Sequence, residues 1–131
     1  MRVLLDTQIL VRAAAGGPPL PPSFRELMRR ADVELLVSAI SIWEVRMKWR
    51  ARHPSGDRKL DLSPDEAIAW ADRNGVPIVP LEGPECAIEI SPPVANDDPY
   101  DDVIAVHAHL LGARLLTTDG KLRGHPLALA P

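Results

Sequence analysis

The sequence lacks the marks of disulfide-stabilised secreted proteins and of membrane-spanning proteins. Cys86 is its only cysteine, so no internal disulfide can form, and a reducing cytoplasm is the expected environment. No apolar run approaches the roughly 20 residues that cross a bilayer. Met1 leads directly into a short apolar stretch without the charged-then-apolar pattern of a signal peptide. We therefore expect a cytoplasmic protein with no membrane segment.

Basic side chains are also missing from a long part of the chain. Residues 74–113 contain no lysine or arginine, whereas seven acidic residues fall within residues 82–102. Residues 46–59 show the opposite bias, with six basic residues and a single acid, Asp57. Such segregation is typical of a protein that attracts a polyanion and holds cations at one place. A solvated basic helix face beside an acidic loop would give the same pattern.

The 131 residues fit a single domain, residues 1–131, and short apolar strands alternate with helices along it. Strands are expected at residues 2–5, 34–38, 76–81, 114–118 and, at an edge, 127–130. Helices are expected at residues 7–14, 22–30, 40–52, 64–74, 84–90 and 99–111. This alternation predicts an α/β fold whose mostly parallel sheet is covered on both faces. Ligand sites in such sheets lie beyond the C-terminal ends of the strands.

Two acidic residues follow predicted strands directly. Asp6 comes after the first strand, and Asp119 comes after the strand that begins at Arg114. Because parallel strands end at the same edge of a sheet, both carboxylates are expected at that edge. The alternative is that each aspartate merely caps the helix or turn that follows it.

Glu44 lies near the start of the third predicted helix. Its position beside an apolar face formed by Ile40, Trp43 and Met47 would direct its carboxylate toward the same edge of the sheet. The spacing of Ser41 and Glu44 is equally typical of a capping box, in which the glutamate only completes the helix start.

Four aspartates crowd into residues 96–102, immediately before an apolar helix. Asp98 precedes Pro99 in the manner of an N-cap, and Asp101 and Asp102 in the first turn gain roughly 0.3–1 kcal/mol each from the helix dipole. Capping and the dipole do not explain why the helix behind them is apolar on nearly every face. Burial of that helix carries Asp101 into the protein, where its charge is costly unless a cation is near.

Convergence of Asp6, Glu44, Asp101 and Asp119 at one edge would raise their pKa values and destabilise the fold. A hard divalent cation removes this repulsion, and Mg²⁺ or Mn²⁺ prefers carboxylate oxygens. A metal held in this way also activates water and stabilises charge on a phosphodiester. The sequence therefore predicts a divalent metal site.

Three blocks of the chain carry a resemblance to a known family. "LLDTQILVR", "SAISIWEVRMKWR" and "DPYDDVIAVHAHLLGARLLTTD" resemble the successive signatures of PIN-domain ribonucleases, and more narrowly of VapC toxins. The resemblance implies a three-layer α/β/α sandwich with a mostly parallel sheet of four to five strands. By position, it identifies Asp6, Glu44, Asp101 and Asp119 as metal-binding and catalytic acids, with Asp98 as a further contributor. The chain departs from the pattern at Asp102, where the family motif has arginine.

The resemblance also implies an activity and partners. It implies a Mg²⁺- or Mn²⁺-dependent endoribonuclease that leaves 5′-phosphate and 3′-hydroxyl ends, forms a homodimer and is held by a cognate antitoxin protein. Thr7 and Thr118 match hydroxyl residues that flank the first and last acids. No histidine is needed as a base, and the four histidines are expected to be structural or on the surface.

RNA would be bound by the basic stretch. Candidates for phosphate contacts are Arg46, Lys48, Arg50 and Arg52, with Arg58 and Lys59 nearby. The tryptophans at helical apolar positions are expected in the core or at an interface. Phosphatase and P-loop patterns are absent, because Gln8 replaces the second aspartate of the former and no Gly-Lys-Ser/Thr follows Gly17. A non-catalytic PIN-like module that binds RNA or protein remains the alternative, and no motif identifies the RNA.

Overall fold

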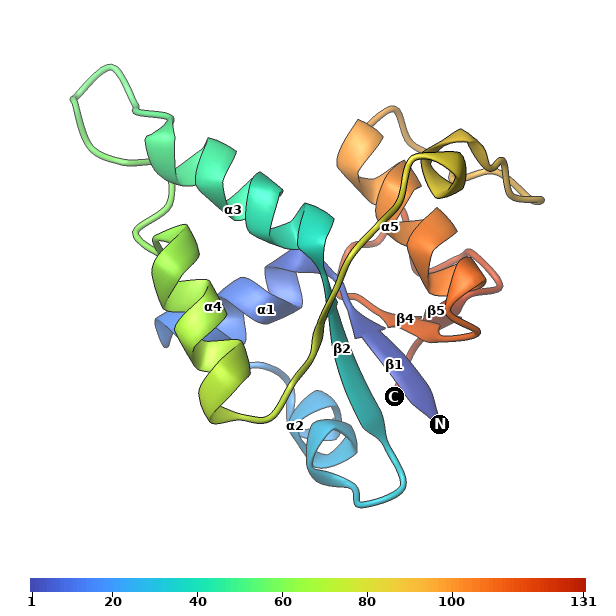
Figure 1. Cartoon of the computed structure of the whole chain (residues 1–131). Helices are drawn as coiled ribbons and strands as arrows, with labels where there is room; N and C mark the ends of the chain where they lie inside the picture. The colour runs from blue at the N-terminus through green and yellow to red at the C-terminus, as the bar shows by residue number, and fades with distance from the viewer.

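The computed structural model describes residues 1–131 and contains five parallel strands in one sheet, in the order β3-β2-β1-β4-β5. The strands are β1 (Arg2–Leu5), β2 (Glu34–Ser38), β3 (Ile78–Val79), β4 (Arg114–Leu116) and β5 (Ala128–Leu129). The helices are α1 (Thr7–Ala15), α2 (Pro22–Arg29), α3 (Ala39–Arg50), α4 (Pro64–Arg73), α5 (Pro99–Leu110) and a short 3₁₀ helix, η1 (Pro84–Ala87). The predicted α/β fold with a parallel sheet is confirmed (Figure 1).

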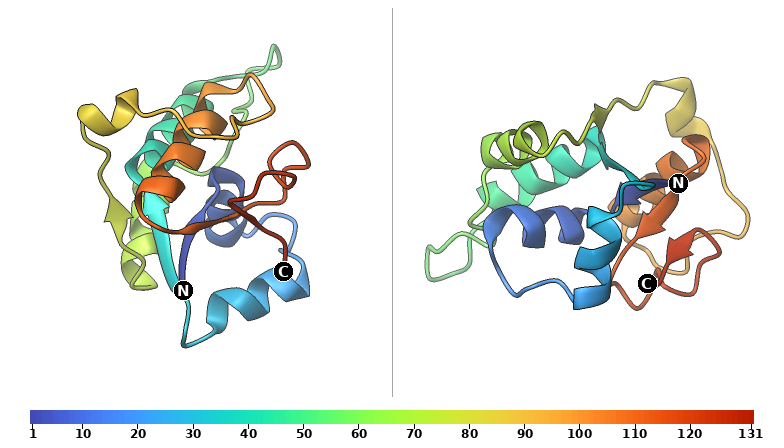
Figure 2. Two further views of the ribbon diagram at one scale, coloured as in Figure 1. Left: turned by 90° about the vertical axis from the view of Figure 1, so that its right-hand side faces the viewer. Right: turned by 90° about the horizontal axis from the view of Figure 1, so that it is seen from below.

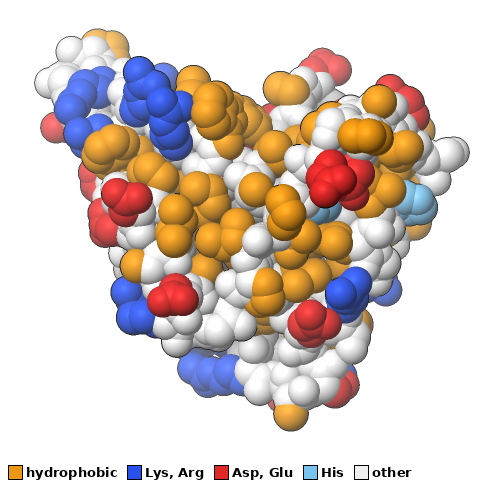
Figure 3. Space-filling model, viewed as in Figure 1, with side chains coloured by type: hydrophobic (Ala, Val, Ile, Leu, Met, Phe, Trp, Pro, Cys, Tyr) orange, Lys and Arg blue, Asp and Glu red, His pale blue; other side chains and the backbone are white.

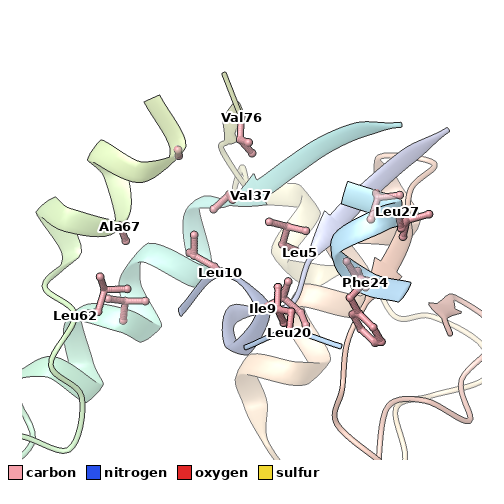
Figure 4. Packing of buried hydrophobic residues seen from close by; sticks show 14 residues of the cluster. Leu5, Ile9, Leu10, Leu20, Phe24, Leu27, Val37, Leu62, Ala67 and Val76 are labelled. Carbon is pink, nitrogen blue, oxygen red and sulfur yellow. The ribbon is translucent and has the colours of Figure 1, made fainter. Parts of the chain in front are cut away.

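The central strand packs a core on each of its faces. Val3 and Leu5 join the cluster under α1 to α4, while Leu4, which points the opposite way, joins the cluster under α5. This alternation is the period of two that a strand imposes on its side chains. Full burial of each such leucine is worth about 1.5–3 kcal/mol. Three layers result, with α5 and the short η1 beside it on one side of the sheet (Figures 1 and 2). The larger cluster is shown in Figure 4.

The helix ends follow the expected local chemistry. Ser63 and Glu66 form a reciprocal capping box at the start of α4, with Pro64 at the first helical position. Asp98 caps α5, because its side chain accepts a hydrogen bond from the Tyr100 backbone N–H at 2.9 Å. Gly112 then adopts a positive φ of 62° just beyond that helix, a conformation that glycine adopts without strain.

Several predicted elements are shorter in the structure, including the strands expected at residues 114–118 and 127–130, and two are shortened most. The strand expected at residues 76–81 covers only Ile78–Val79, because the flanking Pro77 and Pro80 cannot donate to a sheet ladder. The helix expected at residues 84–90 is the single turn of η1. None of the helices has the length and apolar character needed to cross a membrane.

The topology places the carboxyl ends of the strands in the space between α3 and α5, which diverge above the sheet in Figure 1. Strand β1 lies at the centre, paired with β2 on one side and β4 on the other. Figure 3 shows Lys and Arg side chains gathered toward the end of the α3 arm and Asp and Glu side chains on the α5 arm. The charge segregation seen along the chain therefore persists in space.

Candidate active site

Asp6 is positioned by the central strand. It follows β1 directly, and its backbone N–H donates to the carbonyl oxygen of Leu116 on β4 at 2.9 Å. Although Asp6 occupies the N-cap position of α1, its side chain makes no cap hydrogen bond. Its Oδ2 instead accepts a hydrogen bond from Thr117 Oγ1 at 2.7 Å, and the residue is 3% exposed. The capping alternative is therefore wrong for Asp6.

The start of α3 differs from the capping-box alternative. Ser38 is the N-cap of α3, with its hydroxyl accepting from the Ile40 backbone N–H at 3.1 Å. Ser41 lies inside the helix, where its hydroxyl accepts from Thr7 Oγ1 at 2.9 Å. Glu44 is therefore free of any capping role.

Glu44 lies one turn beyond Ser41 on the same buried face of α3. Only 5% of its side chain is exposed, and its Oε2 is 2.6 Å from the Nζ of Lys48. Burial alone lowers the pKa of Lys48, but the hydrogen bond to Glu44 and its negative charge outweigh burial and raise that pKa. A buried carboxylate at this position thus carries its own lysine counter-charge.

The first turn of α5 brings in Asp101. The residue is 8% exposed, and its Oδ2 accepts a hydrogen bond from Asn96 Nδ2 at 2.7 Å. Asp98, one turn earlier, is exposed and serves as the helix cap. Asp101 enters the protein because it lies on the buried side of α5, together with Ile104 and Ala108.

Asp119 follows β4 and is half-buried. Its Oδ1 accepts from the Lys121 backbone N–H at 2.9 Å, so the turn-capping role proposed as an alternative is real for this residue. Its own N–H donates to Thr117 Oγ1 at 3.0 Å. Thr117 thereby connects Asp119 with Asp6 through hydrogen bonds. The sequence predicted Thr118, and not Thr117, as the hydroxyl residue beside the last acid. Asp98, Asp101 and Asp119 line one open cavity of about 410 Å³.

The acids act on one another electrostatically. Burial raises the pKa of Asp6 to about 6, the hydrogen bond from Thr117 opposes this rise, and the charges of Asp101 and Glu44 add to it. Burial likewise raises the pKa of Asp101, against the Asn96 hydrogen bond, and the charges of Asp98, Asp119 and Glu44 reinforce it. Four chain segments that are distant in sequence therefore contribute to one negative site.

No three His, Cys, Asp or Glu side chains are arranged to hold a metal ion as they stand. Each of the four acids has one oxygen engaged by a donor of the chain itself. These donors are Thr117, Lys48, Asn96 and the Lys121 backbone N–H. The only side-chain polar atom that is both buried and without a hydrogen-bond partner is His107 Nε2. The second oxygen of each carboxylate has no such partner, so it must be in contact with solvent. The oxygen-only donor set is the chemistry that Mg²⁺ or Mn²⁺ requires.

His107 lies in the core behind this site. It is fully buried, and its Nδ1 lies 2.8 Å from the Oγ of Ser38. Burial lowers its pKa, so the ring is neutral. This placement agrees with the expected structural role.

The basic stretch is less uniform than its sequence suggests. Arg46 lies over the ring of Trp43, 4.9 Å from the centroid, and Arg52 donates to the Gly56 carbonyl at 2.8 Å. Arg50 is exposed, and Lys48 is paired with Glu44. Trp43 is 51% exposed, so of the two expected places, core or interface, it does not occupy the core.

The buried face of α3 is rotated relative to the predicted apolar face. Met47 is exposed like Trp43, with 41% of its surface accessible. Ser41, Glu44 and Val45 are buried instead. The helix therefore turns polar residues toward the sheet edge and leaves apolar residues outside. Apolar periodicity could not reveal this, because the buried face serves the acidic site.

Comparison with known proteins supports the fold and the family. A model of the PIN domain matches residues 3–125. The crystal structure of VapBC2 from Rickettsia felis, bound to a DNA fragment from their promoter, matches with a TM-score of 0.60 and 18% sequence identity, over 98% of this chain and 96% of that chain. No curated protein matches the chain. Since the family match spans nearly the whole sequence, the chain belongs to the PIN domain family.

Proposed function

We propose that this chain is a Mg²⁺- or Mn²⁺-dependent endoribonuclease of the VapC type, acting in the cytoplasm as the toxin of a toxin–antitoxin pair. The observation that supports the proposal is that four carboxylates from four separate segments lie within electrostatic reach of one another, since the charges of Glu44 and Asp101 raise the pKa of Asp6 and the charges of Asp119 and Glu44 raise that of Asp101. Three of them, Asp6, Glu44 and Asp101, are less than a tenth exposed. A fold tolerates such costly burial most readily where a cation is bound.

Asp6, Glu44, Asp101 and Asp119 would hold the ion, and Asp98 at the mouth of the cavity would add negative charge. A divalent ion bound there supplies an activated water and stabilises the charge that develops on a phosphodiester. Thr117 fixes the orientation of Asp6, and Asn96 fixes that of Asp101. Such orienting partners typically contribute 10–100-fold in metal affinity or activity. Hydrolysis would leave 5′-phosphate and 3′-hydroxyl ends.

The proposed substrate is RNA, approached from the α3 arm. Arg46 and Arg50 lie on the same helix as Glu44, and their charges would contact phosphates. Lys48 and Arg52 belong to the same basic stretch, although each already has a partner within the chain.

The proposed partners are a cognate antitoxin and a second copy of the chain. Trp43 and Met47 expose apolar surface on α3 next to the site, which suits a protein partner. The VapBC2 structure of Rickettsia felis contains a toxin and an antitoxin together. An antitoxin that placed a basic side chain at the acids would match their charge.

Cleavage of a mixed RNA substrate in Mn²⁺ or Mg²⁺ tests the proposal. We expect the wild-type chain to cut and EDTA to abolish cutting. Asp6→Asn and Glu44→Gln should reduce cleavage to background, because each replaces a charged metal ligand by a neutral amide of the same shape. Glu26→Gln is the matched control, since Glu26 is an exposed acid on α2, outside the cavity that the site acids line, and it should cut like wild type.

The alternative function is a non-catalytic PIN-like module that binds RNA or protein. It is favoured if neither EDTA nor Asp6→Asn changes cleavage. An Asp6→Asn variant that binds RNA but cannot cut it supports the nuclease.

A further inference from the structure

The contact between Lys48 and Glu44 differs from an ordinary surface ion pair. Pairs at i and i+4 on a helix normally join two exposed side chains and contribute about 0.3–0.5 kcal/mol. Here Lys48 Nζ lies 2.6 Å from an oxygen of Glu44, whose side chain is 5% exposed, while the Lys48 side chain is 47% exposed. The lysine side chain thus extends from solvent to a buried carboxylate of the site.

The lysine is also the only charged donor among the partners of the four acids. Thr117 and Asn96 are neutral, and Asp119 is bonded by a backbone N–H. Besides Glu44, the charges that act on Lys48 favourably are those of Asp98 and Asp6. Acids from three different segments therefore favour the charged ammonium, which is in contact with Glu44 and carries charge of the sign that a metal ion would bring.

We propose that Lys48 is a built-in counter-cation of the acidic site, which competes with a divalent ion for Glu44 and so weakens metal binding. This inference rests on the proposed metal-dependent function. An ion that takes the Glu44 oxygen now bonded to Lys48 must displace the ammonium. A lysine suits this exchange, because its charge sits on a flexible four-carbon stem and nearly half of the side chain is already in solvent.

Competition has two consequences that a merely structural ion pair would not have. Removal of the ammonium should tighten metal binding, since it removes both a competitor and a repulsive charge. The same removal should destabilise the metal-free protein, since Glu44 then lies buried with no counter-charge. The effects on metal affinity and on metal-free stability are thus opposite in direction.

The test is isothermal titration of Mn²⁺ into the whole chain, comparing wild type with Lys48→Met. We expect Lys48→Met to bind Mn²⁺ roughly tenfold more tightly than wild type. The effect is modest because solvent screens much of the repulsion between the ammonium and the metal ion. Its melting temperature in EDTA should fall, and the increase on adding Mn²⁺ should exceed that of wild type. Lys48→Gln is a second variant with a polar side chain, and it should behave in the same way.

Two control variants separate local competition from a general charge effect. Arg50→Gln removes the same charge from an exposed position on the same helix and should leave Mn²⁺ affinity within about twofold of wild type, because exposed charges are screened. Lys48→Arg keeps the charge and should not tighten binding. Equal or weaker Mn²⁺ binding by both Lys48→Met and Lys48→Gln overturns the competition while leaving the metal site intact. Absence of Mn²⁺ binding in wild type and both variants overturns the proposed metal-dependent function as well.

Discussion

Burial of Asp6 makes the stability of the metal-free protein depend on pH. Its pKa is raised to about 6 in the folded chain, from an ordinary value of 3.8. Below about pH 4 the carboxyl is protonated in both folded and unfolded states, so it imposes no penalty. As the pH rises toward 6, the unfolded chain loses the proton first, and the folded state loses stability. Above pH 6 the penalty is constant, at about 3 kcal/mol for a shift of this size.

We therefore predict that Asp6→Asn stabilises the metal-free protein at pH 7.5. The asparagine oxygen can still accept the hydrogen bond of Thr117, while the buried charge is gone. Urea unfolding in EDTA at several pH values between 4 and 7.5 measures the effect. The free energy of unfolding of wild type should fall with pH more steeply than that of Asp6→Asn, and some slope should remain in the variant because the pKa of Asp101 is raised as well. Identical slopes would show that Asp6 does not carry the penalty.

At the scale of single residues, the sequence identified the acids but not their partners. Strand ends and apolar flanks placed Asp6, Asp119 and Asp101 at one edge of the sheet. Thr117 and Asn96 could not be selected in the same way, because a threonine beside a threonine and an asparagine beside aspartates carry no pattern. Their roles depend on which hydroxyl or amide a particular rotamer brings within 2.7 Å of a carboxylate. The roles of the acids in catalysis remain a prediction.

At the scale of elements, most helices and strands were predicted because their ends carry local signals. Proline at the first position and a serine or aspartate before it mark both α4 and α5. The start of α3 was not predicted correctly, since the capping-box alternative considered Ser41 whereas Ser38 is the cap. Strand β2 continues to Ser38, so the first serine became the cap and Ser41 lay inside the helix. Pairing between strands decides such cases, and it is not visible along a single chain.

The cap of α5 gives a prediction at this scale. Asp98→Ala should lower the free energy of unfolding by about 1 kcal/mol relative to Asp98→Ser, because serine can accept the hydrogen bond from Tyr100 and alanine cannot. Both variants lose the same charge near Asp101, so the comparison isolates the cap. Thermal and urea unfolding in EDTA measure the difference. Equal stabilities of the two variants would mean that the Asp98 hydrogen bond does not support the helix.

At the scale of the whole molecule, charge is separated although the net charge is only −3. The α3 arm carries basic side chains and the α5 arm carries acids (Figure 3). The candidate site takes one acid from α3 and one from α5, together with those that follow β1 and β4. A polyanion is attracted by the first arm and repelled by the second. We therefore expect RNA to bind in one orientation, with its backbone along α3 and one phosphate at the acids.

This arrangement predicts a directional salt dependence of RNA binding. Binding of single-stranded RNA to the Asp6→Asn variant should weaken linearly on a log–log plot against salt, with a slope of about −0.7 for each phosphate neutralised. Adding Arg50→Gln should reduce the magnitude of that slope by about 0.7 and weaken binding at low salt. Arg25→Gln removes the same charge from an exposed position on α2, a helix that contains none of the four site acids. It should leave the slope unchanged. Equal effects of the two substitutions would indicate attraction to overall charge and would contradict an RNA path along α3.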